Sequence, residues 1–105
     1  SYEIRTLLWR ELIPPSAPLH DDVDYNELGR KFELGPRGIS YSIARACSHA
    51  IMRMQHSNQS QNNNQNSNQN KIGSKVCQKD LLMGGEAEVT KLRSGNMETL
   101  SKMFL

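Results

Sequence analysis

The chain has 105 residues, with 13 Lys or Arg, 11 Asp or Glu, and a formal net charge of +2. This length allows one small domain, and the nearly balanced charge argues against a nucleic-acid surface. The sequence has no apolar run long enough for a transmembrane helix and no basic-then-apolar start typical of a signal peptide. Since it begins at Ser1 and not Met, we expect the chain to be part of a longer protein.

The first predicted element is an amphipathic helix over residues 2–12, where leucine and isoleucine recur at helical spacing. Trp9 flanks this apolar stripe, so we expect it to be half buried. Pro14 and Pro15 stop the helix, and residues 13–20 are therefore expected to form an extended connector.

Two further helices are predicted before the middle of the chain. Asp24 and Glu27 have the spacing of a capping box and predict a short helix that ends near Glu33. Gly35 then suits the N-cap of a third helix, and a proline follows at its first helical position. Apolar residues at helical spacing extend this third helix over residues 36–55.

The second half of the chain begins with a polar tract. Residues 57–70 consist only of Ser, Asn and Gln, and we expect residues 57–74 to be a disordered insertion because they cannot bury a core. A fourth helix is predicted from about Gln78 to Leu92. Gly84-Gly85 lies in its middle and costs about 1 kcal/mol per glycine relative to alanine, which leaves open whether the helix is continuous there. A separate terminal helical turn is expected over residues 97–104.

These elements predict an all-α fold, a small bundle of three or four helices with a disordered Asn/Gln-rich loop. Residues 1–56 supply the first three helices, residues 57–74 the insertion, and residues 75–105 the last helix and a tail.

The sequence offers no catalytic constellation. His49 is expected to be exposed on the third helix, with nothing at helical spacing to activate it. Cys47 and Cys77 lack zinc-ligand spacing, so we expect reduced thiols in an intracellular, cytoplasmic protein and no metal site. Asp21, Asp22 and Asp24 lack the pattern of an EF-hand and are read as a loop and helix cap.

The start of the third helix is the strongest candidate for a binding site. Gly35, Pro36, Arg37 and Gly38 stand where a helix exposes N–H groups and the positive end of its dipole, which attract anions. The Arg37 guanidinium adds a planar fork suited to phosphate oxygens. The plainer alternative is that Arg37 is an ordinary surface residue on a helix start.

Several segments in a characteristic order resemble the C-terminal helical lid of AAA+ ATPases. The resemblance covers residues 2–55, and it resumes more weakly at residues 77–82 and 88–92. Its motifs are RTLLWRELIP, APL, DVD and LGPRGI, followed by IARACSHA. The polar tract and Gly84-Gly85 depart from the family pattern.

The resemblance implies a lid that closes over ATP and Mg²⁺ bound mainly by a large subdomain outside these residues. It places Leu8 near the adenine, Leu12 where many members have a histidine near the ribose or base, and Gly35 and Pro36 near the nucleotide. Arg37 matches the sensor 2 arginine that touches the γ-phosphate in other branches of the superfamily, whereas the most similar branch usually has a small residue there. The resemblance also implies a hexameric ring that remodels a protein substrate, with these residues inactive alone because they lack a Walker A motif.

Two other functions stay open. The chain can be a stand-alone helical protein-interaction module without nucleotide binding, using its apolar stripes and its methionine-containing tail as an adaptable surface. The second and third helices can also form a helix-turn-helix, although the balanced charge of residues 1–56 disfavours binding to nucleic acid.

Overall fold

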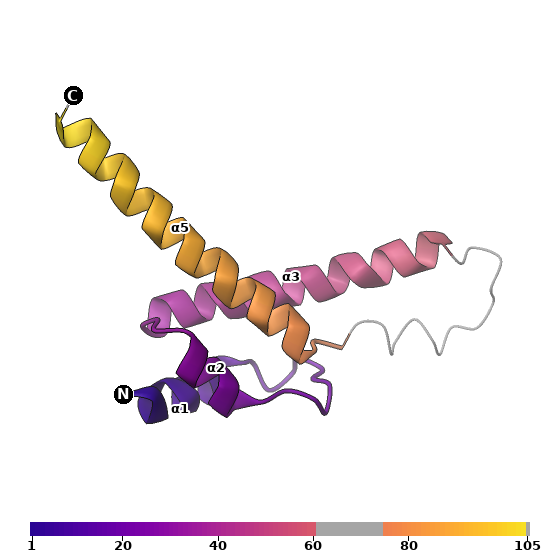
Figure 1. Cartoon of the computed structure of the whole chain (residues 1–105). Coiled ribbons are helices and arrows are strands. Elements are labelled where there is room, and N and C mark those ends of the chain that lie inside the picture. The colour runs from indigo at the N-terminus through magenta and orange to yellow at the C-terminus, as the bar shows by residue number, and fades with distance from the viewer. Residues whose placement is uncertain (61–74, 105) are drawn as a thin grey trace.

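The computed structural model describes residues 1–60 and 75–104, which form four α-helices and no strand. The helices are α1 (Tyr2–Leu12), α2 (Tyr25–Lys31), α3 (Pro36–Ser60) and α5 (Gln78–Phe104). The predicted all-α bundle is confirmed, while residues 61–74 of the predicted insertion lie outside the described residues. The two long helices α3 and α5 cross, and α1 and α2 pack together beside this crossing (Figure 1).

The α1–α2 pair is built on a close approach at Gly29. A side chain there would overlap with the Thr6 hydroxyl and with the backbone of α1, so only glycine fits without movement. The Arg5 Nε atom donates a 2.8 Å hydrogen bond to the carbonyl of Gly29 and locks the two helices at this point.

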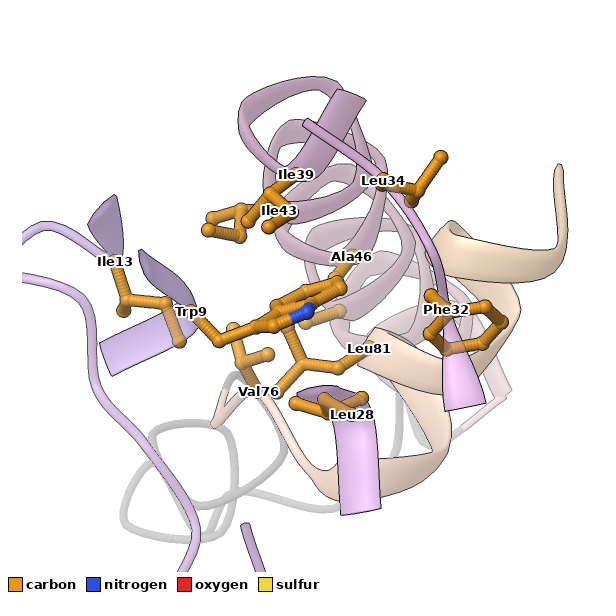
Figure 2. Close-up of a cluster of buried hydrophobic side chains, with 11 residues drawn as sticks. Trp9, Ile13, Leu28, Phe32, Leu34, Ile39, Ile43, Ala46, Val76 and Leu81 are labelled. Carbon is orange, nitrogen blue, oxygen red and sulfur yellow. The ribbon is translucent and has the colours of Figure 1, made fainter. Parts of the chain in front are cut away.

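Trp9 lies at the centre of the core and is fully buried, so the predicted half-burial is wrong (Figure 2). Its ring packs on Phe32, with ring centroids 6.2 Å apart and an interplanar angle of 44°. The remaining core comes from every helix and from the segment before α5, which is why a position beside the α1 stripe is covered. Its other members include Ile13, Leu28, Leu34, Ile39, Ile43, Ala46, Ala50, Val76 and Leu81.

The cap of α2 follows only half of the predicted capping box. Asp24 accepts hydrogen bonds from the backbone N–H groups of Asn26 and Glu27, at 3.0 and 3.2 Å. The reciprocal bond from Glu27 is absent, because the side chain of Gln78 on α5 takes both partners. Gln78 Oε1 accepts from the Asp24 N–H at 2.9 Å, and Gln78 Nε2 donates to Glu27 at 2.7 Å.

The connector before α2 is held by backbone pairing that the sequence does not predict. Leu19 and Val76 form an isolated parallel bridge, in which the Val76 N–H donates to Pro18 at 2.9 Å and the His20 N–H donates to Val76 at 2.8 Å. The chain entering α5 is therefore fixed beside the connector.

Both long helices exceed their predicted lengths. α3 continues to Ser60, five residues beyond the predicted Gln55, as expected when an established helix propagates into polar residues. α5 is continuous through Gly84-Gly85, where the sequence left continuity open, and residues 97–104 belong to the same helix. The glycines lie at the crossing, where Gly84 faces the backbone of Ser42. No helix in the described residues is long and apolar enough to cross a membrane.

Candidate functional site

The first turn of α3 presents an exposed anion-attracting end. The carbonyl of Gly35 accepts the first bond of the helix, from the Ile39 N–H at 2.9 Å, and Pro36 occupies the first helical position. The N–H groups of Arg37 and Gly38 precede this bond and have no partner within the helix. The side chain of Arg37 is exposed, which fits both a ligand contact and an ordinary surface residue on a helix start.

A hollow of about 350 Å³ lies between this turn and α5. Arg37 and Lys91 are the two cations that line it, and the Lys91 Nζ atom lies 5.2 Å from the centroid of the Tyr41 ring. Leu34 and Leu92 supply apolar surface. Two cations beside a helix N-terminus suit binding of an anion, although the exposed Glu33 also lines the hollow and offsets part of this positive charge. Nothing in the hollow resembles a nucleophile with its base.

Glu88 also lines this hollow, but its carboxylate is directed into the protein. Its side chain is only 3% exposed, and its Oε2 atom lies 3.5 Å from the Arg45 Nε atom without a proper hydrogen bond. Since Oε2 has almost no accessible surface, a ligand in the hollow cannot reach it without movement of the helix. Glu88 is therefore paired with Arg45 and is not available to contact a ligand in the hollow.

The structure brings only part of the predicted site together. Gly35, Pro36 and Arg37 share the hollow, whereas Leu8 and Leu12 do not line it. Both leucines are half buried on α1 and pack against the hydrophobic core. The adenine contact that the resemblance assigns to Leu8 stays a prediction.

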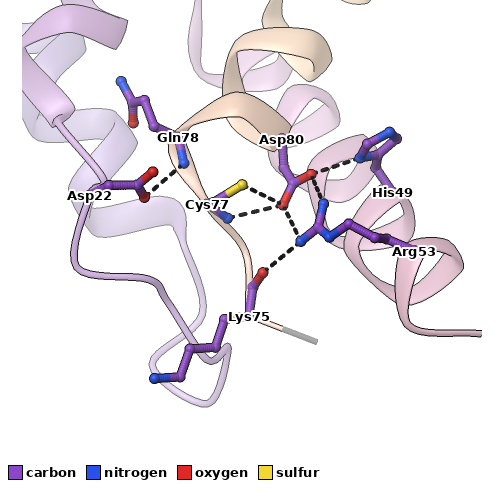
Figure 3. Close-up of polar contacts among 7 residues, drawn as sticks. All are labelled: Asp22, His49, Arg53, Lys75, Cys77, Gln78 and Asp80. Carbon is purple, nitrogen blue, oxygen red and sulfur yellow. Dashed lines mark hydrogen bonds and ion pairs between the residues drawn. The ribbon is translucent and has the colours of Figure 1, made fainter. Parts of the chain in front are cut away.

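A second polar cluster joins α3 to the first turn of α5 (Figure 3). Asp80 is completely buried and binds the Arg53 guanidinium through two contacts, at 2.5 and 3.0 Å. Its Oδ1 atom lies 2.7 Å from His49 Nδ1, and its Oδ2 atom accepts from the Cys77 N–H at 2.9 Å. Arg53 also donates to the carbonyl of Lys75 at 2.9 Å, so one side chain fixes both α5 and the chain that leads into it.

The environment keeps Asp80 ionised. Burial alone raises the pKa of Asp80, but hydrogen bonds from Arg53, the Cys77 backbone and His49 overcome this effect and hold the pKa well below its usual range. The same bond to Asp80 raises the pKa of Arg53. Asp80 and Arg53 therefore form a permanent ion pair between the long helices.

The expectation that His49 is simply exposed is corrected by this cluster. Its ring is partly buried and tied to a carboxylate 31 positions away in the sequence. One signal was available: Arg45, His49 and Arg53 follow each other at spacing four on α3, and Asp80 and Glu88 lie eight apart on α5. Within the described residues, no group of three His, Cys, Asp or Glu side chains can hold a metal ion.

Cys47 provides a solution test of this packing. Burial and the nearby charge of Asp80 both raise the pKa of the Cys47 thiol, so less thiolate is present at mildly alkaline pH. We expect iodoacetamide to label Cys47 at least roughly threefold more slowly in the folded chain than in urea. Peptide mass spectrometry measures both rates, and equal rates would show that the thiol is not shielded.

Comparison with known proteins adds no relative: no protein-family model, curated protein or solved structure matches the chain. The likeness to AAA+ lids thus rests on the sequence motifs alone.

Proposed function

We propose that the chain is the C-terminal lid subdomain of an AAA+ ATPase. The observation that carries this proposal is the exposed Arg37 at the N-terminus of a 25-residue helix, beside a second cation, Lys91, in one hollow. The sequence motifs around Leu8 and Gly35 and the all-helical fold support it.

In this role the chain binds and does not itself catalyse. Arg37 places its guanidinium against the γ-phosphate, where two parallel N–H donors match the oxygen geometry. ATP and Mg²⁺ are held mainly by the large subdomain, which supplies the chemistry of phosphoryl transfer. The Arg53–Asp80 pair joins α5 to α3, so a displacement at the first turn of α3 moves both long helices together. This motion passes to neighbouring subunits of a hexameric ring and to a protein substrate.

The test is made in the full-length protein that carries this chain. We expect Arg37→Ala to lower kcat for ATP hydrolysis roughly a hundredfold, the scale seen when one donor to a developing charge is removed. Arg93→Ala removes an exposed arginine from α5 outside the hollow and should leave kcat unchanged. The kcat for ATP hydrolysis is measured for wild type and both variants. Equal kcat for wild type and Arg37→Ala rules out a contact of Arg37 with the γ-phosphate during hydrolysis.

A helical protein-interaction module without nucleotide binding is the second candidate. The exposed Met52 and Met83 favour it, because large apolar side chains on a surface commonly mark a contact site. If the full-length protein fails to bind a fluorescent ATP analogue, the lid proposal falls and the module becomes the better account.

A further inference from the structure

A groove separate from the hollow at Arg37 lies between α3 and α5 and includes Gly84 at their crossing. Its volume is about 480 Å³. Ala44, Gly84 and Ala87 form a part of its floor that is apolar and carries only small side chains. Met52 and Met83 line it with side chains that are 65% and 44% exposed. Flexible thioether side chains around a shallow groove are well suited to bind apolar groups of different shapes.

The charge of the groove wall has one sign. α3 contains no Asp or Glu, and its Arg45 side chain lines the groove and is 44% exposed. Of the carboxylates that balance this wall, Asp80 lines the groove without exposed surface, and Glu88 is buried outside the lining. A molecule entering the groove therefore meets accessible N–H donors of Arg45 and no accessible carboxylate.

We propose that this groove binds a peptide segment of a partner protein in which an acidic residue lies within one helical turn of a bulky aliphatic or aromatic residue. The apolar side chain packs between Met52 and Met83, and the carboxylate accepts hydrogen bonds from Arg45. A guanidinium has five N–H donors, and the loose 3.5 Å contact with Glu88 leaves most of them available. The groove shares no lining residue with the hollow at Arg37, so this binding does not depend on the lid proposal.

Selection from a random phage-displayed library of peptides of about twelve residues, against the whole chain, tests the proposal. We expect enriched peptides to combine Asp or Glu with Leu, Ile, Phe or Trp at most four positions apart. The affinity of the most enriched synthetic peptide, measured by fluorescence anisotropy, should weaken as the salt concentration rises.

Two variants of neighbouring residues locate the binding site. Met52→Glu places a carboxylate in the groove and should weaken the peptide at least roughly tenfold. Ile51→Glu introduces the same charge on a side chain that is 49% exposed but does not line the groove, and it should bind like the wild type. The proposal is overturned by an absence of enrichment, by enriched peptides without acidic residues, or by equal effects of the two variants.

Discussion

Replacing Asp80 with alanine is expected to lower the free energy of unfolding by about 3 kcal/mol. The change removes the acceptor for Arg53, His49 and the Cys77 N–H together, at a position that is completely buried. Arg53 is 37% exposed and can regain water, which keeps the loss near the lower end for a broken buried pair. Urea unfolding followed by far-UV circular dichroism measures the change.

The matched control for this variant is Lys79→Ala, which alters an exposed side chain on the same turn of α5. We expect its free energy of unfolding to stay within about 0.5 kcal/mol of the wild type. A similar loss in both variants would show that the turn is merely sensitive to mutation and that the buried cluster contributes little.

The pH dependence of the same pair of proteins gives a separate test. The pKa of Asp80 is lowered in the folded state, so its stabilising contribution is fully present above the ordinary aspartate pKa, near about 4. This contribution decreases as the pH falls from there toward the folded-state pKa. The stability difference between wild type and Asp80→Ala should therefore narrow as the pH falls below about 4. A difference that stays constant in acid would contradict the lowered pKa.

The helices are predictable because their signals are local. Proline and glycine at the start of α3, and Asp24 at the start of α2, act within one turn of the chain. The predictions from sequence fail where a segment distant in the chain supplies the hydrogen-bond or packing partner of a residue. Gln78 replaces Glu27 in the α2 cap, and Phe32 covers Trp9, and neither contact is encoded in the spacing around the residue itself.

The candidate site likewise has a part that the local sequence predicts and a part that depends on distant segments. The exposed first turn of α3 with Arg37 follows from the sequence, since a helix N-terminus needs no distant partner to be recognised. The contribution of Lys91 depends on how α5 crosses α3, and the burial of Asp80 depends on the same crossing. Single-helix patterns contain no information on that angle, so the polar cluster appears only in the folded chain.

The crossing itself depends on Gly84, and Gly84→Ala is expected to lower the free energy of unfolding by about 3 kcal/mol. A methyl group there would overlap with the carbonyl oxygen of Ser42, a backbone atom that cannot rotate away, so α3 and α5 must separate. This cost exceeds the gain of about 1 kcal/mol that alanine brings to an unpacked helix position. The loss therefore measures helix packing and not helix propensity.

Alanine variants of two other glycines serve as controls for this prediction and are measured in the same urea unfolding experiment. Gly35→Ala meets no atom within 4 Å and should change the free energy of unfolding by less than about 1 kcal/mol. The nearest atoms to a methyl group added in Gly85→Ala belong to the ring of Phe32, a side chain. This variant should cost about 2 kcal/mol, partly recovered when Phe32→Leu is added. No side-chain substitution at Ser42 should recover Gly84→Ala, because the conflict there is with the backbone. If Ser42→Ala restores Gly84→Ala to wild-type stability, the overlap at the crossing involves the Ser42 side chain and not its main chain. The proposed backbone contact between α3 and α5 is then wrong.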